Sequence, residues 1–237
     1  MDLILYLSTL KLEIRKIKMK NISKENYLST IFRFRSKQGG IKTNHIAEKL
    51  DISNAAVTDM MKKLSRDGFV EYERYKDIKL TEEGESYAKN MVRRHRIWEL
   101  FLQRIVGMPW DKVHDEAENL EHSSSDDLIN RLEEMLGYPE FDPHGDPIPD
   151  KNGTLPRQKN LIPLSLVSSG ETVEVIRVND YDNNFLNYLS GIGLELNKKF
   201  KVKNILDFDK SMLISVDEKD INISNTIAAN IFVVRTN

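Results

Sequence analysis

The segment HDEAENLEH, residues 114–122, places two histidines and four carboxylates within nine residues. On a helix, where each residue is rotated by about 100° from the last, its ligand-type side chains share one face: His114, Glu118, Glu121 and His122. Neighbouring carboxylates repel one another and raise their own pKa values unless a cation lies between them. The pattern favours a divalent-metal site over its alternative, an acidic helix face in solvent.

A second pair of ligand types, His95 and Glu99, is spaced four residues apart on the preceding predicted helix. If the two helices pack antiparallel, the two sets of side chains can meet. The chain has no cysteine, so any metal must be held by oxygen and imidazole nitrogen. These donors suit Mn²⁺, Fe²⁺, Co²⁺ or Zn²⁺ better than Ca²⁺, and the lack of cysteine fits a reducing cytoplasm.

Enzymatic alternatives are a zinc hydrolase and a carboxylate-pair glycosidase. The HExxH spacing of zinc hydrolases is absent, and no G-x-S-x-G nucleophile motif occurs. We therefore expect that the protein is not an enzyme.

Charge is distributed unevenly, although the net charge is only −2. Residues 1–75 carry 15 Lys/Arg against 9 Asp/Glu, which is +6, whereas residues 76–151 carry 10 against 18, which is −8. This asymmetry indicates a basic part that meets a polyanion and an acidic part that meets cations.

The apolar runs fall short of the roughly 20 residues that a membrane-spanning helix needs, so we expect no membrane contact. In the first residues an apolar stretch precedes the basic ones, the reverse of a secretory signal. Residues 1–20 are interpreted as an N-terminal extension, or as the product of an upstream start that adds no structure.

The basic part has the element order of a winged helix-turn-helix. Helical spacing of apolar residues predicts helices at Lys24 to Phe34, Ile41 to Leu50 and Ala55 to Leu64. Alternating apolar residues predict short strands at Phe69 to Tyr72 and Ile78 to Thr81. In this fold the second helix of the motif enters the major groove. Candidates for base and phosphate contacts at its start and exposed face are Ser53, Asn54, Ala55, Thr58, Asp59 and Lys62. Candidates for phosphate contacts are Thr43, Lys63, Arg74, Tyr75 and Lys76.

The remaining chain is predicted to be helical up to a Pro/Gly-rich stretch and then to form a small β domain. The predicted helices are Thr81 to Val106, Trp110 to His122 and Ser125 to Leu136. The predicted strands are Glu171 to Val178, Lys199 to Leu206, Ser211 to Val216 and Ile231 to Val234. The fold class is therefore α+β with several domains.

From about Lys24 to Asn237, the chain resembles the DtxR/MntR family of metal-dependent transcriptional repressors. Motifs that carry the resemblance include Ile46-Ala47-Glu48-Lys49-Leu50, Leu80-Thr81-Glu82-Glu83-Gly84, Arg94-His95-Arg96, Val113-His114-Asp115-Glu116-Ala117, Leu120-Glu121-His122 and Pro143-His144-Gly145. The resemblance implies a cytoplasmic homodimer that binds double-stranded operator DNA in response to divalent metal ions. The implied domains are an N-terminal extension (1–20), a winged helix-turn-helix DNA-binding domain (21–84), a helical metal-binding and dimerisation domain (85–150), a linker (151–163) and an SH3-like, FeoA-type barrel (164–237).

The resemblance also implies metal-ligand sets. The ligands that match the site that switches DNA binding are Glu118, Glu121 and His122, with Asn26 from the N-terminal helix. Those that match a neighbouring ancillary site are His95, Glu99 and His114. Those that match a second site in similar family members are Asp142, His144, Asp180 and Asn183.

Three positions depart from the family pattern. Glu118 stands where iron-type members have cysteine, which favours Mn²⁺, with Fe²⁺ as the alternative and Co²⁺ or Zn²⁺ as substitutes. Asn26 stands where manganese-type members have aspartate, and Asp142 replaces a cysteine of several relatives. The hypothesis is a metal-activated repressor of metal-uptake genes. The alternative is a metal-binding or storage protein whose helix-turn-helix mediates protein contacts, which a flat salt dependence of DNA binding would favour.

Overall fold

The computed structural model describes residues 24–35, 39–180 and 182–236. The chain divides into two compact units between Arg93 and Arg94, and each unit is described by itself. The predicted extension, residues 1–20, lies outside the described residues. Within the described ranges, no helix combines the length and the apolar character needed to cross a membrane.

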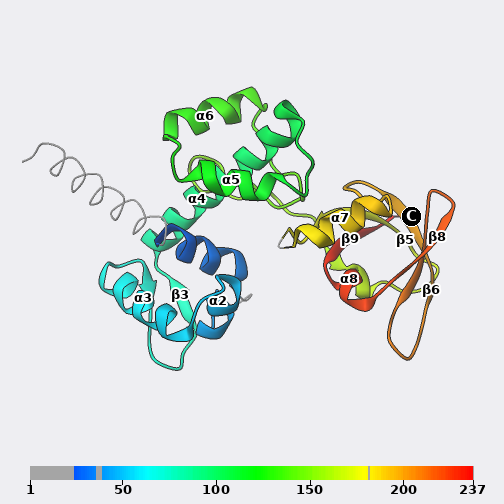
Figure 1. The fold of residues 1–237 in the computed structure, drawn as a ribbon, viewed down its shortest axis with the longest axis horizontal. Helices are drawn as coiled ribbons and strands as arrows, with labels where there is room; N and C mark the ends of the chain where they lie inside the picture. Colours follow the sequence, from blue (N-terminus) through cyan, green and yellow to red (C-terminus); the bar gives the residue numbers. More distant parts are fainter. Residues whose placement is uncertain (1–23, 36–38, 181, 237) are drawn as a thin grey trace, which may run out of the picture. The chain divides into compact units, whose positions relative to one another are not determined.

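The first unit is a winged helix-turn-helix, as predicted from its element order (Figure 1). Its elements are a helix at residues 24–34, β1 (Gly40–Ile41), α2 (Thr43–Lys49), α3 (Asn54–Arg66), β2 (Val70–Glu71) and β3 (Ile78–Leu80). The strands pair antiparallel in the order β1-β3-β2. Ile46, Val57 and Leu64 are fully buried and belong to the α2–α3 core. The Oγ of Ser53 accepts a hydrogen bond from the backbone N–H of Ala56 at 3.2 Å and caps α3.

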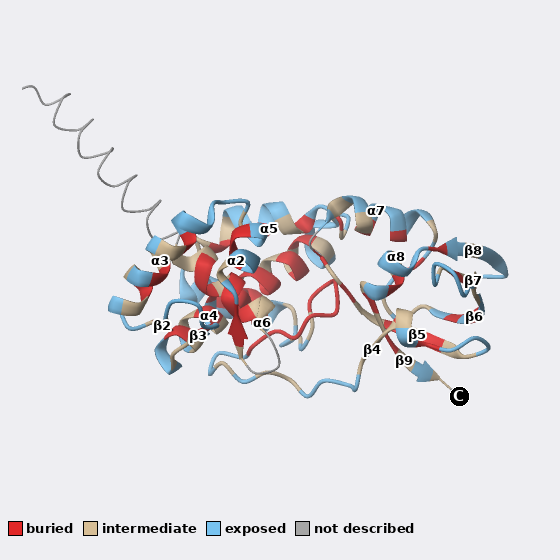
Figure 2. Cartoon of the chain, turned by 90° about the horizontal axis from the view of Figure 1, so that it is seen from below, coloured by how far each residue is buried: buried red, intermediate tan, exposed pale blue. Residues whose placement is uncertain are grey.

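The second unit begins within the long helix α4 (Glu82–Phe101), which continues as a π-helical turn, η1 (Leu102–Val106). Two further helices follow, α5 (Val113–Glu121) and α6 (Asp126–Met135). The predicted helix from Trp110 starts three residues later, because residues 110–112 form a turn. Ile97 and Leu100 of α4 pack against Ile129 and Leu132 of α6. This contact places one face of α4 in the interior, as Figure 2 shows by its buried segments.

The rest of the second unit is a six-stranded antiparallel sheet with the order β4-β9-β5-β6-β7-β8. Its elements are β4 (Ile162–Pro163), η2 (Leu164–Leu166), β5 (Thr172–Val178), α7 (Asn183–Gly191), β6 (Lys199–Ile205), β7 (Met212–Val216), β8 (Lys219–Ile223), α8 (Asn225–Ala229) and β9 (Ile231–Thr236). The four predicted strands are present. The helices α7 and α8 and the strands β4 and β8 were not predicted, because short elements give weak periodicity. The strand β4 lies at the end of the predicted linker, 151–163, and pairs with β9.

The irregular segment 142–149 is buried throughout and is packed rather than loose. The Oδ1 of Asp142 accepts hydrogen bonds from the backbone N–H groups of His144 and Asp146 at 2.8 and 2.9 Å. Gly145 has a φ of 89° and lies against β5, where an added Cβ would be 2.1 Å from the backbone oxygen of Ile176. Glycine is therefore required here both by its conformation and by the close approach.

We expect Gly145→Ala to lower the free energy of unfolding by about 3 kcal/mol, because a strained φ and a backbone clash add. Denaturant unfolding measures this loss. Gly137→Ala is the matched control: Gly137 also has a positive φ, 76°, but no heavy atom lies within 4 Å of its added Cβ. The control should lose about 1 kcal/mol. Equal losses in the two variants would show that the approach to Ile176 is unimportant.

Candidate metal centre

The predicted meeting of the two histidine–carboxylate sets occurs between α4 and α5. His95 Nδ1 lies 2.6 Å from Glu121 Oε2, and His95 Nε2 lies 2.9 Å from Glu99 Oε1. His114 Nδ1 is 3.1 Å both from Glu99 Oε1 and from His95 Nε2. The exposed fractions of His95, Glu99 and Glu121 are 7%, 0% and 6%. The i,i+4 spacing of α4 therefore aims two ligand types into the interior.

A second group forms where the buried segment 142–149 meets α4. One ligand atom each from Glu99, Asp142 and His144 lie within 4.8 Å of one another, and the same holds for His95, Glu99 and His114. Asp180, which follows β5, is 1% exposed, and its Oδ2 lies 3.9 Å from His114 Nδ1. Glu99 is thus common to both groups.

Other predicted ligands lie apart from these groups or are held differently. Glu118 is exposed on α5, and Asn183 donates from Nδ2 to Asp115 Oδ2 at 3.3 Å. His122 Nε2 lies 3.5 Å from Glu121 Oε1. Asn26 belongs to the first unit; its Oδ1 is buried and accepts no hydrogen bond from the described residues. Its role as a ligand stays a prediction.

When no metal cation is bound, protons on nearby side chains balance the negative charge of the buried carboxylates. Burial alone lowers the pKa of His95. The negative charges and hydrogen bonds of Glu99 and Glu121 outweigh burial and raise the pKa of His95 to about 10. Burial alone raises the pKa of Glu99, whereas His95 and His114 hold it well below its usual value. Burial, with the nearby Asp146 and Glu99, raises the pKa of Asp142 to about 7. At neutral pH the His95 imidazole is therefore charged.

The residues of the second group fit a divalent cation. Glu99 Oε2, Asp142 Oδ2 and His144 Nδ1 are buried, and none has a hydrogen-bond partner within the described part of the chain. Each such atom costs about 1–3 kcal/mol, which coordination would remove. Two carboxylate oxygens and an imidazole nitrogen, without sulfur, suit Mn²⁺ or Fe²⁺.

Two residues that support this group were not among the predicted site residues. His144 Nε2 lies 2.9 Å from the backbone oxygen of Trp110, so this nitrogen donates and leaves Nδ1 as the ligand atom of the neutral ring. The Trp110 ring stacks on His144 with centroids 5.8 Å apart. Arg96 Nε lies 3.3 Å from Asp142 Oδ2. In the sequence, the position of Arg96 directly after His95 is the signal that could have identified Arg96 as part of the site.

The predicted DNA-contacting residues lie on the first unit. Residues 53–55, Asp59 and Lys62 are exposed along α3, and Arg74, Tyr75 and Lys76 are exposed at the tip of the β2–β3 hairpin, whereas Thr43, Thr58 and Lys63 are half-buried. Lys62 pairs with Asp59 at 3.3 Å and Lys76 with Glu73 at 2.7 Å. Exposed pairs of this kind are weak, so the two lysines remain available to phosphates.

A winged helix-turn-helix followed by a helical unit with a buried histidine–carboxylate cluster defines a DNA-binding protein of the metal-dependent class. Comparison with known families agrees with this class. Residues 21–78 match "Iron dependent repressor, N-terminal DNA binding domain", residues 81–150 match "Iron dependent repressor, metal binding and dimerisation domain", and residues 162–235 match "FeoA domain".

Individual relatives support the same assignment. The chain is 34% identical over 158 residues to the iron-dependent repressor IdeR of Mycobacterium tuberculosis, covering 64% of this chain and 69% of that protein. It is 34% identical over 124 residues to the transcriptional regulator MntR of Bacillus subtilis, covering 52% and 87%. A solved structure of a manganese-dependent transcriptional repressor in complex with manganese is 33% identical, with a TM-score of 0.83 over 90% of this chain and 100% of the other. The chain belongs to this family of iron- and manganese-dependent repressors, whose members are DNA-binding proteins and not enzymes.

We expect divalent-metal binding to release protons, because His95 has a raised pKa of about 10 and must lose its proton to coordinate a metal. The apparent affinity for Mn²⁺ should therefore rise as the pH increases from 6 to 8, by up to about tenfold per unit for each proton released. Calorimetric titration in buffers of different ionisation enthalpy measures the number of protons. A pH-independent affinity with no proton release would contradict this expectation.

Proposed function

We propose that this protein is a repressor activated by Mn²⁺, with Fe²⁺ as the alternative metal, that binds operator DNA as a homodimer and controls genes for metal uptake. The observation that carries the proposal is the cluster of the buried His95, Glu99 and Glu121 with the half-buried His114, in the unit that follows the winged helix-turn-helix. Such a regulator acts where its operator lies, so the proposal places it in the cytoplasm.

The proposed ligands form two groups that share Glu99. One group is His95, Glu99 and His114, and the other is Glu99, Asp142 and His144, with Asp180 beside them. The absence of sulfur ligands from both groups supports Mn²⁺ over metals that prefer soft sulfur ligands. The assignment of Glu118, Glu121, His122 and Asn26 to a switching site remains a proposal that rests on the family resemblance.

A bound cation would supply fixed positive charge in place of protons. Glu121 is then the residue that responds directly, because its Oε2 lies 2.6 Å from Nδ1 of His95, and the raised pKa of this ring, about 10, keeps a proton on it at neutral pH. Loss of that proton removes the cationic partner of Glu121 and leaves its carboxylate available as a ligand. A dimer that reads two half-sites needs its recognition helices at a fixed spacing, so ordering by metal lowers the free-energy cost of binding DNA.

We expect Glu121→Gln to lower metal-stimulated operator affinity about 10- to 100-fold, because an amide brings no charge to the cation. Operator DNA, obtained by selection from random sequences with Mn²⁺ present, is titrated with protein in MnCl₂, in Fe²⁺ under anaerobic conditions, or in chelator. Glu116→Gln, an exposed residue of the same helix, is the matched control and should bind as the wild type does. Equal DNA binding by the wild type with and without metal would disprove the proposal.

Lys62 tests the DNA-binding surface separately from the metal. We expect Lys62→Ala to weaken binding to all DNA sequences and to reduce the slope of log affinity against log salt by about 2 for the homodimer, because one phosphate contact is lost from each protomer. Lys159→Ala removes the same charge from an exposed position of the second unit and should leave the slope unchanged. If both variants behave like the wild type, α3 does not contact DNA through Lys62.

A further inference from the structure

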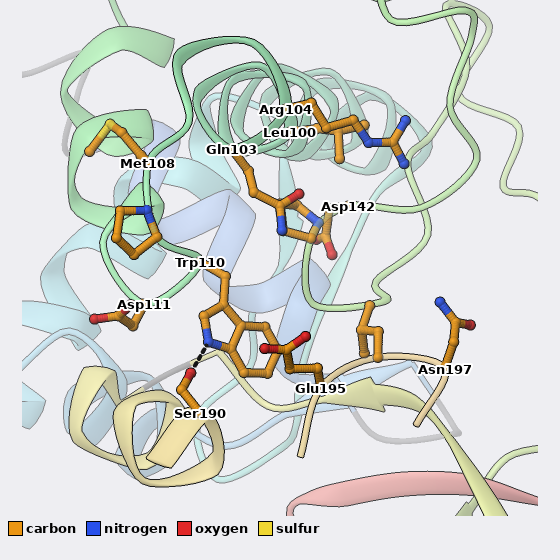
Figure 3. Close-up of a pocket in the computed structure, with 13 residues that line it drawn as sticks. Leu100, Gln103, Arg104, Met108, Trp110, Asp111, Asp142, Ser190, Glu195 and Asn197 are labelled. Carbon is orange, nitrogen blue, oxygen red and sulfur yellow. Dashed lines mark hydrogen bonds between the residues drawn. The ribbon is translucent and has the colours of Figure 1, made fainter. Parts of the chain in front are cut away.

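A cavity of about 590 Å³ lies in the second unit, beside the second group of candidate ligands (Figure 3). Its wall is formed by the end of α4 and η1, by the turn at Trp110, by the start of the buried segment 142–149 and by residues 190–197. This volume is in the range of small-molecule sites, and it greatly exceeds the share of one water molecule, about 30 Å³. A hydrated metal ion fits inside it.

The cavity reaches the buried ligand group through Asp142. Glu99, Asp142 and His144 are 0%, 4% and 0% exposed, so an ion cannot meet them directly from solvent. Of these three residues, Asp142 is the one that also lines the cavity. Its Oδ2 has no hydrogen-bond partner within the described residues and lies 3.3 Å from the Nε of Arg96. Asp142 therefore belongs both to the wall of the cavity and to the buried group.

The charge of the lining favours a cation. Asp111, Asp142 and Glu195 line the cavity, against one basic residue, Arg104. Glu195 is exposed, and Figure 3 shows its carboxylate directed toward the ring of Trp110. That ring donates from Nε1 to Ser190 Oγ at 2.7 Å and stacks on His144. An acidic cavity with low-dielectric walls concentrates cations and raises their association rate.

We propose that this cavity is the entrance through which a hydrated divalent cation reaches Glu99, Asp142 and His144, and that Glu195 is the residue that attracts the ion at its mouth. The inference rests on the proposed metal-dependent function and adds to it a route of loading. Glu195 acts here on the rate of loading and is not itself a ligand of the buried group.

The test is rapid mixing of the full-length protein with MnCl₂, followed by tryptophan fluorescence. The chain has two tryptophans, and the one at 110 contacts His144. Asp142→Asn identifies the fluorescence phase that belongs to the buried group, because that phase should be lost. Glu195→Gln should slow this phase about fourfold, and Glu195→Lys should slow it further, because a carboxylate near the path of a divalent ion is removed or reversed. The rate should also become less sensitive to salt.

Asp207→Asn is the matched control, since it removes one negative charge at an exposed turn between β6 and β7. Its loading rate should equal that of the wild type. The thermal midpoint of the metal-free Glu195 variants should also be unchanged, and their equilibrium Mn²⁺ affinity should fall by less than the rate does. An affinity loss as large as the rate loss would identify Glu195 as a ligand and overturn the assignment as an entrance.

The proposed function and the proposed entrance can be disproved separately. If the wild type shows no equilibrium binding of Mn²⁺, the proposed function fails and the entrance fails with it. If the wild type binds Mn²⁺ but the Glu195 variants load as fast as Asp207→Asn, only the entrance is disproved. The entrance is also disproved, and the proposed function is not, if Asp142→Asn removes no fluorescence phase.

Discussion

Carboxylates can be buried side by side only when positive charge is buried with them, because an isolated ion loses its hydration in the protein interior. This constraint governs the helical part of the second unit. Glu99 and Glu121 are buried around His95, and Asp142 and Asp146 are buried near Arg96. Because α4 supplies both cations and Glu99, its interior face combines the apolar contacts of a core helix with the electrostatics of a site.

The two kinds of cation have different consequences. Arg96 keeps its charge at any physiological pH, so one positive charge always lies beside Asp142 and Asp146, and its Nη1 also donates to the backbone oxygen of Pro147. The imidazoles of His95 and His144 can lose their protons. The permanent cation therefore holds segment 142–149 in place, while the titratable cations are the ones that a metal ion can replace. Segment 142–149 therefore lies beside one cation of fixed charge and near imidazoles whose charge depends on pH.

Much of this organisation follows from spacing along the sequence. The i,i+4 pair His95 and Glu99 on α4 lies beside His114 and Glu121, as helical periodicity, which is local and strong, predicted. Glu118, on the same predicted face, is exposed instead. The contributions of Arg96 and Trp110 could not be predicted in this way, since they depend on a loop whose path is fixed by the approach of Gly145 to β5. The weakly periodic α7 and β8 were missed for a related reason: their burial is set by packing within the sheet domain rather than by a local pattern.

The charges of the cluster also bear on how many ions it can hold. Glu99 directs Oε1 toward His95 and His114 and Oε2 toward His144, at 3.9 Å from its Nδ1. One carboxylate can therefore serve both groups with a different oxygen, so occupation of one group does not withdraw the ligand from the other. Two divalent ions held by the two groups would repel each other at an effective dielectric constant near 20, and this repulsion must be matched by buried negative charge. With the histidines neutral and Arg96 assigned to Asp146, four negative charges remain, on Glu99, Glu121, Asp142 and Asp180. Charge balance thus admits two divalent ions, and fewer carboxylates would admit only one.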